Sequence, residues 1–423
     1  MAIILKTSPR TFSPVYNKNE HCIFQDDAAI RTKPDYRYLF DIKISDYISG
    51  STIIVRTKVS PDPSNALGVQ DVQGFVEQYV KEHIVPYNST DAIANTENAI
   101  ISYFVEYGEE YRLTTADPIV EYQNQLTGTI KWAWGSSLET HRWIDFYNLI
   151  EYTSYLFDTN NQGEFLTNYK TPTNFITDLG WHWYLTDDPV NVDFVRVLTY
   201  DNAGGLIDTF DIPNNANTAV DNSRMNSVAT APQSLNNITG AFLVGAQPVI
   251  ISTVATYTIQ CFKTGGFSVG EVLTFTVDTP CFYEVYRIHF ENEYGAFDSF
   301  NFTKNSKRSS KGSRKSYVTN SPTLSTSGIS YKHSTENKVD YFGMNTDSIS
   351  LVSDLIDTQT NNWLKEMAFT NRAFLEFTDS SGVKNFKPCK VLSTSWSESI
   401  DAIDKAFNFE VEIELADNFK QRT

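Results

Sequence analysis

Short segments in which large apolar residues alternate with polar ones recur along the chain, and they limit the folds that it can adopt. The clearest is Phe407–Leu415, where Phe, Val, Ile and Leu alternate with Asn and Glu, and residues 36–45 show the same period. Successive side chains of a strand point to opposite faces, so this pattern predicts half-buried β-strands. Hydrophobic residues make up 41% of the 423 residues and aromatic ones 14%, which is typical of packed β structure rather than of a disordered chain.

Turn signals and helical spacing divide the first part of the chain into two regions. Residues 1–170 are predicted to form an α+β domain, with a hairpin at 36–58, a helix that Asp71 caps and that ends before Pro86, and a second helix over 137–157. Residues 171–302 are predicted to form an antiparallel β-sandwich-like domain. Its expected strands are 180–185, 192–200, 206–212, 249–262, 271–278, 282–290 and 296–302. Within it, residues 213–240 are predicted to be a long surface loop.

The last part of the chain begins with a change in composition. Residues 303–338 are rich in Ser, Thr, Asn, Lys and Arg and contain almost no large apolar residue, which predicts a linker or an extended arm. Residues 339–423 are predicted to form a small domain with a helix over 350–367 and strands at 374–377, 383–394 and 407–415. The expected fold class is therefore a β-rich α+β chain of several domains, with antiparallel β-sandwich-like modules, a few helices and a small C-terminal α+β domain.

The net charge and one cationic segment indicate which partners the chain can bind. With 34 Lys and Arg against 51 Asp and Glu, the formal net charge is −17, which disfavours broad wrapping of nucleic acid. One segment runs against this balance, with the cations Lys304, Lys307, Arg308, Lys311, Arg314 and Lys315. It is open to two interpretations: a solvated loop, or an arm that docks onto acidic surface of a neighbouring subunit or onto nucleic acid. Because the chain is acidic, self-association is the more economical form of the second.

The cysteines and the apolar runs carry little further signal. The four cysteines, Cys22, Cys261, Cys281 and Cys389, are too scattered for a disulfide framework or a CxxC metal site. We expect buried free thiols, although Cys261 and Cys281 could face each other across a hairpin. The N-terminus lacks the basic region of a secretory signal, and no stretch approaches the ~18 apolar residues of a membrane span. These features predict a soluble protein without a general export signal.

Three patterns could carry catalysis or a metal, and each has a simpler interpretation. Residues 266–270 match G-x-S-x-G around Ser268, but a strand-like run follows instead of the helix that a nucleophile elbow requires, so a hairpin turn is expected. His141, Asp145 and His182 lack the convergent spacing of a zinc or iron site. The adjacent carboxylates at 109–110 and 187–188 do not by themselves form the acid/base pair of a glycosidase. We therefore expect no enzyme, no metal and no cofactor, and keep a hydrolase built on Ser268 or a carboxylate pair as a lesser hypothesis.

Tryptophans offer a different kind of candidate site. The rings of four of them could stack on sugars, as in carbohydrate-binding modules: Trp132, Trp134, Trp181 and Trp183. Aromatic residues in a β-rich protein are more commonly buried in the core, and Trp181 and Trp183 share one predicted strand face. A glycan-binding surface stays an alternative to the core interpretation.

Residues 287–302, RIHFENEYGAFDSFNF, read as a strand, an Asn-x-x-Gly turn and a second strand. This segment resembles a motif of virion structural proteins of tailed bacteriophages of Bacteroidetes, the crAss-like phages included. The hairpin and helix at 36–84 are similar to a companion segment of the same proteins. So is the C-terminal part, with its acidic helix at 350–367, the pair Lys387-Pro388 and the strand at 407–415. Together these segments cover about half of the chain.

The resemblance implies a non-enzymatic structural component of a phage tail: an adaptor ring, a hub or baseplate subunit, or the base of a fibre. Its implied partners are copies of itself in a symmetric ring and other tail, portal or fibre proteins. It would be assembled in the host cytoplasm and reside in the virion tail, and an acidic lumen would let DNA pass without specific binding. The alternative is a tail protein that binds a host receptor or glycan.

Overall fold

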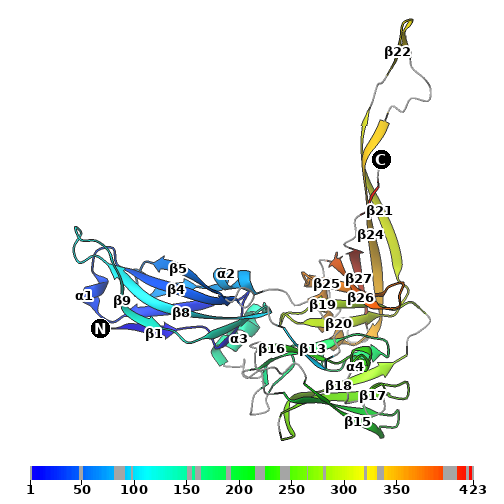
Figure 1. The fold of residues 1–423 in the computed structure, drawn as a ribbon, viewed down its shortest axis with the longest axis horizontal. Helices are drawn as coiled ribbons and strands as arrows, with labels where there is room; N and C mark the ends of the chain where they lie inside the picture. The colour runs from blue at the N-terminus through cyan, green and yellow to red at the C-terminus, as the bar shows by residue number, and fades with distance from the viewer. Residues whose placement is uncertain are drawn as a thin grey trace. The chain divides into compact units, whose positions relative to one another are not determined.

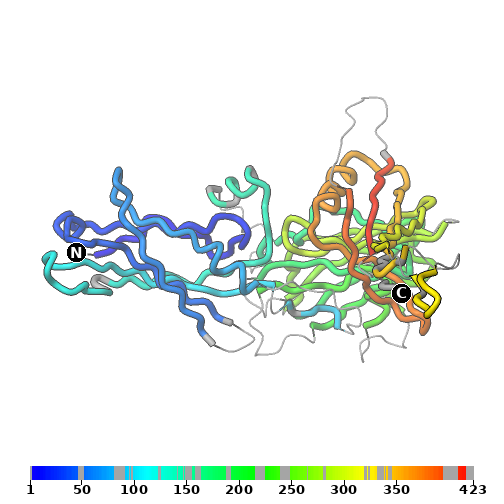
Figure 2. Tube along the Cα trace, turned by 90° about the horizontal axis from the view of Figure 1, so that it is seen from above, coloured from blue at the N-terminus to red at the C-terminus, as the bar shows by residue number. Residues whose placement is uncertain are grey.

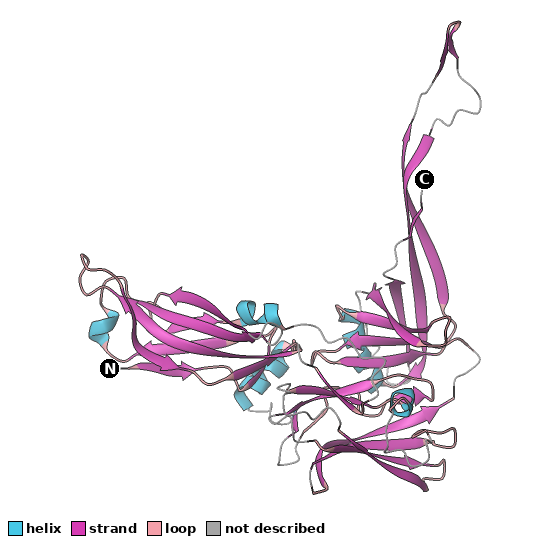
Figure 3. Ribbon diagram, viewed as in Figure 1, coloured by secondary structure: helices cyan, strands magenta, loops and turns pink. Residues whose placement is uncertain are grey.

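The computed structural model describes residues 2–46, 51–80, 91–96, 99–149, 155–157, 163–186, 192–214, 224–238, 248–263, 265–279, 283–318, 322–330, 338–393, 407–415 and 419–421. Strands predominate in the described part of the chain, with 54% of its residues in strands against 11% in helices (Figure 3). The predicted β-rich, multi-domain fold with antiparallel sheets and few helices is therefore confirmed. The chain forms two compact units: unit 1, Met1–Thr279 with Asn292–Asp298, and unit 2, Pro280–Glu291 with Ser299–Thr423.

Unit 1 begins with two sheets that enclose a common core (Figures 1 and 2). The smaller sheet consists of β1 (Ile3–Thr7), β3 (Glu20–Gln25) and β6 (Gly68–Asp71). The larger one consists of β2 (Phe12–Pro14), β10 (Lys131–Trp134), β8 (Ile100–Tyr111), β4 (Arg37–Asp46), β5 (Ser51–Val59) and β9 (Val120–Thr127). Ile23 of the first sheet and Phe40 and Tyr107 of the second lie in that core. The predicted hairpin at 36–58 is confirmed as β4 and β5.

The rest of unit 1 contains two further sheets in mutual contact. One consists of β11 (Leu156–Phe157), β13 (Trp181–Thr186), β16 (Met225–Ala229) and β7 (Ile93–Asn95). The other consists of β12 (Thr173–Phe175), β18 (Phe267–Asp278), β17 (Thr256–Lys263), β14 (Phe194–Tyr200) and β15 (Leu206–Pro213). They meet where the rings of His182 and Phe275 lie 5.6 Å apart, edge to face. The expected strands between residues 180 and 278 are present, but β17 begins at Thr256 rather than at residue 249, and β18 begins at Phe267, four residues earlier than predicted.

Helices are few and short in the part of the chain that the structure describes. They are α1 (Ala28–Arg31), α2 (Gln73–Val76), the 3-10 turn η1 (Glu77–Tyr79), α3 (Thr140–Leu149), α4 (Pro232–Asn236) and α5 (Thr358–Phe369). The predicted N-cap is one residue too early, since Val72 is the N-cap of α2; the carboxylate of Asp71, just before it, accepts from the backbone N–H of Gln73 at 3.0 Å. The helix that follows is shorter than expected, since α2 gives way to η1 and Val80 is extended, and residues 81–86 of that prediction lie outside the described residues.

Unit 2 is built on one large sheet. Its strands, in spatial order, are β20 (Phe297–Phe302), β19 (Tyr286–Glu291), β25 (Ala373–Thr378), β26 (Lys384–Val391), β27 (Phe407–Leu415), β24 (Lys338–Ile356) and β21 (Lys307–Val318), with β28 (Phe419–Gln421) also on β24. A separate pair is formed by β22 (Thr323–Ser325) and β23 (Gly328–Ser330). Asp357 caps α5, accepting from the N–H of Thr360 at 2.7 Å, and Trp363 of this helix contacts Phe290. One face of the sheet therefore carries the core of unit 2.

Further predictions need correction. The helix expected over 137–157 is present as α3 at Thr140–Leu149, while residues 156–157 form strand β11. The helix expected over 350–367 exists only from Thr358, because residues 350–356 continue β24, whose alternate side chains enter the core. The surface loop expected at 213–240 contains the buried strand β16 and α4. The stretch 303–338 is not a linker, since β21 pairs along its whole length with β24. Residues 171–279 belong to the same compact unit as the N-terminal region, so the units do not follow the expected boundaries at 170 and 302.

Candidate subunit interface

The cationic segment singled out in the sequence forms one strand of a long two-stranded ribbon. β21 pairs antiparallel with β24, and Figure 1 shows the two strands running on together beyond the rest of the sheet of unit 2. The side chains of β21 are almost all exposed, since a ribbon without a covering layer has no buried face. This explains why the segment lacks large apolar residues although it forms a regular strand.

The strand geometry separates the cations that the sequence places together. Side chains of a strand alternate between its two faces, so Lys307, Lys311 and Lys315 share one face and form a lysine row. Arg308 and Arg314 point to the opposite face, and Lys304 precedes the strand. The sequence prediction of a single cationic arm therefore resolves into the lysine row on one face and two arginines on the other.

At least three of the six cations interact with other groups of the chain. Lys304 Nζ lies 2.9 Å from Asp354 Oδ2, and its hydrogen bond lowers the pKa of the Asp354 carboxyl. Arg308 donates to Tyr286 Oη at 3.0 Å, which raises the pKa of its guanidinium, and also reaches Glu284 at 3.2 Å. Arg314 lies 3.7 Å from an Asp340 oxygen.

Lys307 and Lys311 differ from these three. Neither has an ion-pair partner among the residues that the structure describes, and both are exposed. At these two positions, the face of the ribbon therefore has positive charge that no described carboxylate within 4.0 Å offsets.

An acidic row lies on the same face of the sheet, and sequence reasoning missed it. Glu410 pairs with Val352, Glu412 with Ser350 and Glu414 with Ser348. Ser350 in turn pairs with Lys307, and the hydroxyl oxygens of Ser348 and Ser309 lie 2.7 Å apart. Residues opposite each other in a sheet project from the same face, so this register places the glutamates of β27 and the lysines of β21 on one face. The alternating Glu of Phe407–Leu415 was the available signal, but only the pairing of β27 with β24 shows its neighbours.

The tryptophans proposed for glycan stacking are mostly internal. Trp134, Trp181 and Trp183 are 1%, 4% and 1% exposed, so their ring faces are not accessible to a sugar. Trp132 is half-buried; it stacks on Phe12 at 6.5 Å, and the guanidinium of Arg224 lies 5.1 Å from its ring centroid. The core interpretation fits three of the four, and the glycan-binding alternative rests on Trp132.

The sequence patterns with catalytic potential have structural roles where they are described. Ser268 lies on β18 opposite Phe262, after a turn in which Gly265 and Gly266 have positive φ, so G-x-S-x-G forms a hairpin and no nucleophile elbow. Glu109 and Glu110 are adjacent on β8 and point to opposite faces. The first is buried and accepts from Gln25 and Tyr36, while Glu110 accepts from Lys58 at 2.6 Å.

The metal candidates were weak in the sequence and do not converge in the structure. Within the described part of the chain, no group of three or more His, Cys, Asp or Glu side chains is arranged to hold an ion. His182 is occupied by the hydroxyl of Thr230 at 2.8 Å. The side chain of His141 and residues Asp187 and Asp188 lie outside the described residues.

The cysteines in the described ranges are free thiols. Cys261 and Cys389 are buried, as expected, and burial raises the pKa of Cys389 to about 12. Cys22 is half-buried, and Cys281 lies outside the described residues, so its pairing stays a prediction.

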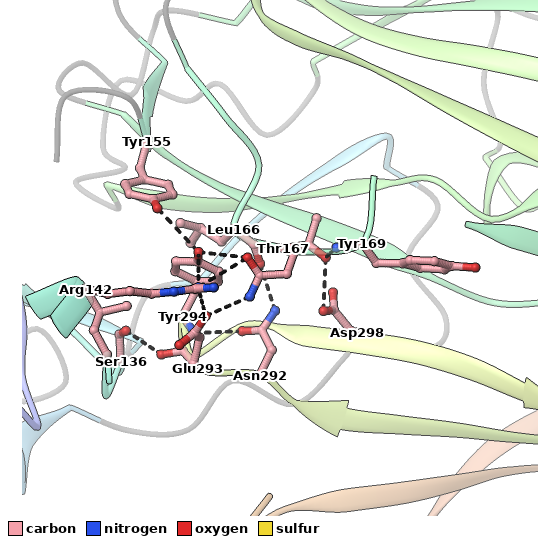
Figure 4. A network of polar contacts seen from close by, with 12 residues as sticks. Ser136, Arg142, Tyr155, Leu166, Thr167, Tyr169, Asn292, Glu293, Tyr294 and Asp298 are labelled. Carbon is pink, nitrogen blue, oxygen red and sulfur yellow. Dashed lines mark hydrogen bonds and ion pairs between the residues drawn. The ribbon is translucent and has the colours of Figure 1, made fainter. Parts of the chain in front are cut away.

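The turn of the motif at 287–302 is anchored in unit 1 by a polar network (Figure 4). The Asn292 side chain accepts from the backbone N–H groups of Tyr294 and Ala296 and donates to the carbonyl of Leu166 at 2.8 Å. The Trp134 indole N–H donates to the carbonyl of Tyr294 at 3.0 Å. These bonds explain the Asn-x-x-Gly turn of the motif as a packing element.

Charged groups complete the network around the same turn. The Glu293 carboxylate accepts from Arg142 and, at 2.7 Å, from Asn168. The Tyr294 hydroxyl lies 3.0 Å from both Arg142 and Asn168, and burial raises its pKa. The positive charge of Arg142 therefore balances the negative charge of the Glu293 carboxylate. Together these hydrogen bonds fix the position of the turn.

Comparisons with known proteins add no family. No protein-family model and no curated protein matches the chain. Among solved structures, the P pilus usher (PapC) translocation pore aligns with 90% of this chain and 77% of its own at 8% identity, with a TM-score of 0.11. A TM-score this low carries no argument about fold or function. In the described residues, no helix combines the length and the apolar character needed to cross a membrane.

Proposed function

We propose that the chain is a non-enzymatic structural subunit of a phage virion tail that works through oligomeric assembly. The supporting observation is the lysine row of β21 on a projecting ribbon, in which Lys307 and Lys311 are exposed without a described ion-pair partner although the chain has a net charge of −17. A neighbouring copy of such a chain offers acidic surface, and charge complementarity would guide and orient the contact. The tail assignment itself rests on the resemblance of residues 287–302 and of the C-terminal part.

The ribbon of β21 and β24 is long enough for a contact between subunits. β24 comprises 19 residues and β21 comprises 12. At ~3.3 Å per residue, β21 is about 40 Å long and β24 about 60 Å. Most of an interface of standard size could form along such a length without a change in the core of unit 2.

Light scattering of the purified protein at two salt concentrations tests the assembly. We expect a discrete oligomer at low salt that dissociates at high salt, because exposed charge pairs are screened over about 8–10 Å at physiological ionic strength. A monomer at both salt concentrations would contradict the proposal.

Limited proteolysis tests whether the ribbon is the contact. Trypsin should cut between Lys307 and Lys315 in isolated chains and much more slowly in the oligomer. Cleavage after Lys18, whose side chain is 66% exposed in the other unit, serves as the internal reference. Equal rates of cleavage in the isolated chain and in the oligomer would show that the ribbon is not part of the interface.

A further inference from the structure

We propose that the partner of the lysine row is the glutamate row of a second copy, so that two chains pair face to face around a twofold axis. This inference rests on the proposed assembly function and specifies its contact. The two rows lie on one face of one sheet, on β21 and β27, with β24 between them. This face of the sheet therefore carries both the positive and the negative charges that a contact between two copies needs.

The strand register defines the arrangement of the charges. Glu412, Ser350 and Lys307 form one line across β27, β24 and β21. With strands ~4.8 Å apart, the backbones of Glu412 and Lys307 are separated by about 10 Å. The middle strand presents hydroxyl side chains on this face, Ser348 and Ser350, which keep the two rows apart without adding charge.

A twofold axis parallel to β24 and above its serines brings the two rows into register at the level of Ser350, where Lys307 and Glu412 lie. Rotation about this axis exchanges the two sides of β24 but does not shift residues along the strand direction. The strand β27 of one copy therefore faces β21 of the other. Lys307 then lies opposite Glu412 of the second copy, and Glu412 lies opposite its Lys307. Such an isologous contact forms each charge pair twice and closes after two chains.

The charges of the face are available for this contact. Glu410, Glu412, Lys307 and Lys311 are exposed, and none of the four has an ion-pair partner among the described residues. Lys390 lies opposite Glu414 on the neighbouring strand β26 and offsets part of the charge at that end of the row. Glu410 and Glu412 are therefore the acidic residues that the contact would use most.

Charge reversal tests the pairing directly. In Lys307→Glu/Lys311→Glu, both rows are acidic; in Glu410→Lys/Glu412→Lys, both are basic. Each variant alone should raise the dissociation constant of the pair by a factor of at least about 100, because like charges then face each other. An equimolar mixture should associate again, since an acidic face meets a basic one. The chain with all four substitutions should associate with itself like the wild type.

Sedimentation equilibrium at low salt provides the readout, and two control variants separate the effect of the face from that of the strand. Arg314→Glu changes the same strand on its opposite face and should leave the dissociation constant within about twofold of the wild-type value. Lys307→Glu alone should raise the dissociation constant clearly, because Lys307 is the cation at the level of Glu412. All substituted side chains are exposed, so the circular dichroism spectrum and the melting temperature should stay unchanged.

The failure of this inference can be distinguished from that of the proposed function. If lysine reversal abolishes assembly, glutamate reversal has no effect and the mixture forms no mixed pairs, the ribbon docks elsewhere and only the twofold pairing is overturned. If the wild type is a monomer, or if neither reversal changes its assembly, the proposed function is overturned as well.

Discussion

Replacing Gly295 with alanine should loosen the turn that Figure 4 shows. Gly295 has φ +70°, and a Cβ atom there would overlap the carbonyl oxygen of Gly135 and lie 3.1 Å from the nitrogen of Ser136. The conflict is with backbone atoms, which no side-chain rotation can relieve. The turn would have to withdraw, and with it the hydrogen bond from Trp134 to the Tyr294 carbonyl.

The cost has two parts that a control separates. A non-glycine residue in the left-handed region costs about 1–2 kcal/mol, and overpacking adds about 1–3 kcal/mol, so G295A should lose about 2–5 kcal/mol of unfolding free energy. Gly204 has φ +81° and nothing within 4 Å of a Cβ, so G204A should show the backbone cost alone. Urea unfolding followed by tryptophan fluorescence measures both. Equal losses in the two variants would refute the close packing of the turn against Gly135.

The remaining predictions concern titration and thiol chemistry. Burial alone would raise the pKa of Glu376, but the hydrogen bond from His289 and the charges of His289, Arg287 and Lys384 outweigh it and lower the pKa to about 2. This carboxylate should therefore stabilise the fold fully above its ordinary pKa of 4.5 and lose that contribution as the pH falls toward 2. In Glu376→Gln, the slope of unfolding free energy against pH should flatten in this range, and an unchanged slope would contradict the assignment. Iodoacetamide should modify the half-buried Cys22 well before Cys261 and Cys389, as peptide mass spectrometry can show; faster labelling of Cys261 would contradict its burial.

Sequence patterns predicted the strands that have one buried and one exposed face. Residues 407–415 form a strand with the predicted ends, and residues 192–200 form one from Phe194, because alternate side chains of each strand enter a core. β16 was missed because its residues, Met-Asn-Ser-Val-Ala, are buried on both faces and show no alternation. β21 was missed as a strand for the opposite reason, since neither of its faces is buried.

The candidate interface was only half predictable for a related reason. The cations of residues 304–315 are neighbours in the sequence, so composition alone identifies them. Their division into two faces needs the strand assignment. The placement of Glu412 beside them needs two pairings, of Lys307 with Ser350 and of Ser350 with Glu412, which are 43 and 62 positions apart in the sequence. The register between strands that are distant in the sequence cannot be read from the residue pattern of any one strand.

Among the described strands, β21 is the last of its sheet, so one of its edges carries backbone N–H and C=O groups that pair with no further described strand. Such edges invite the addition of strands from other molecules, and lysines along them oppose it. The lysine row would thus restrict which neighbours can approach the free edge to those that bring negative charge. Replacing Lys307 and Lys311 with threonine or valine should then do more than weaken a specific contact: it should open the edge to indiscriminate strand pairing and aggregation.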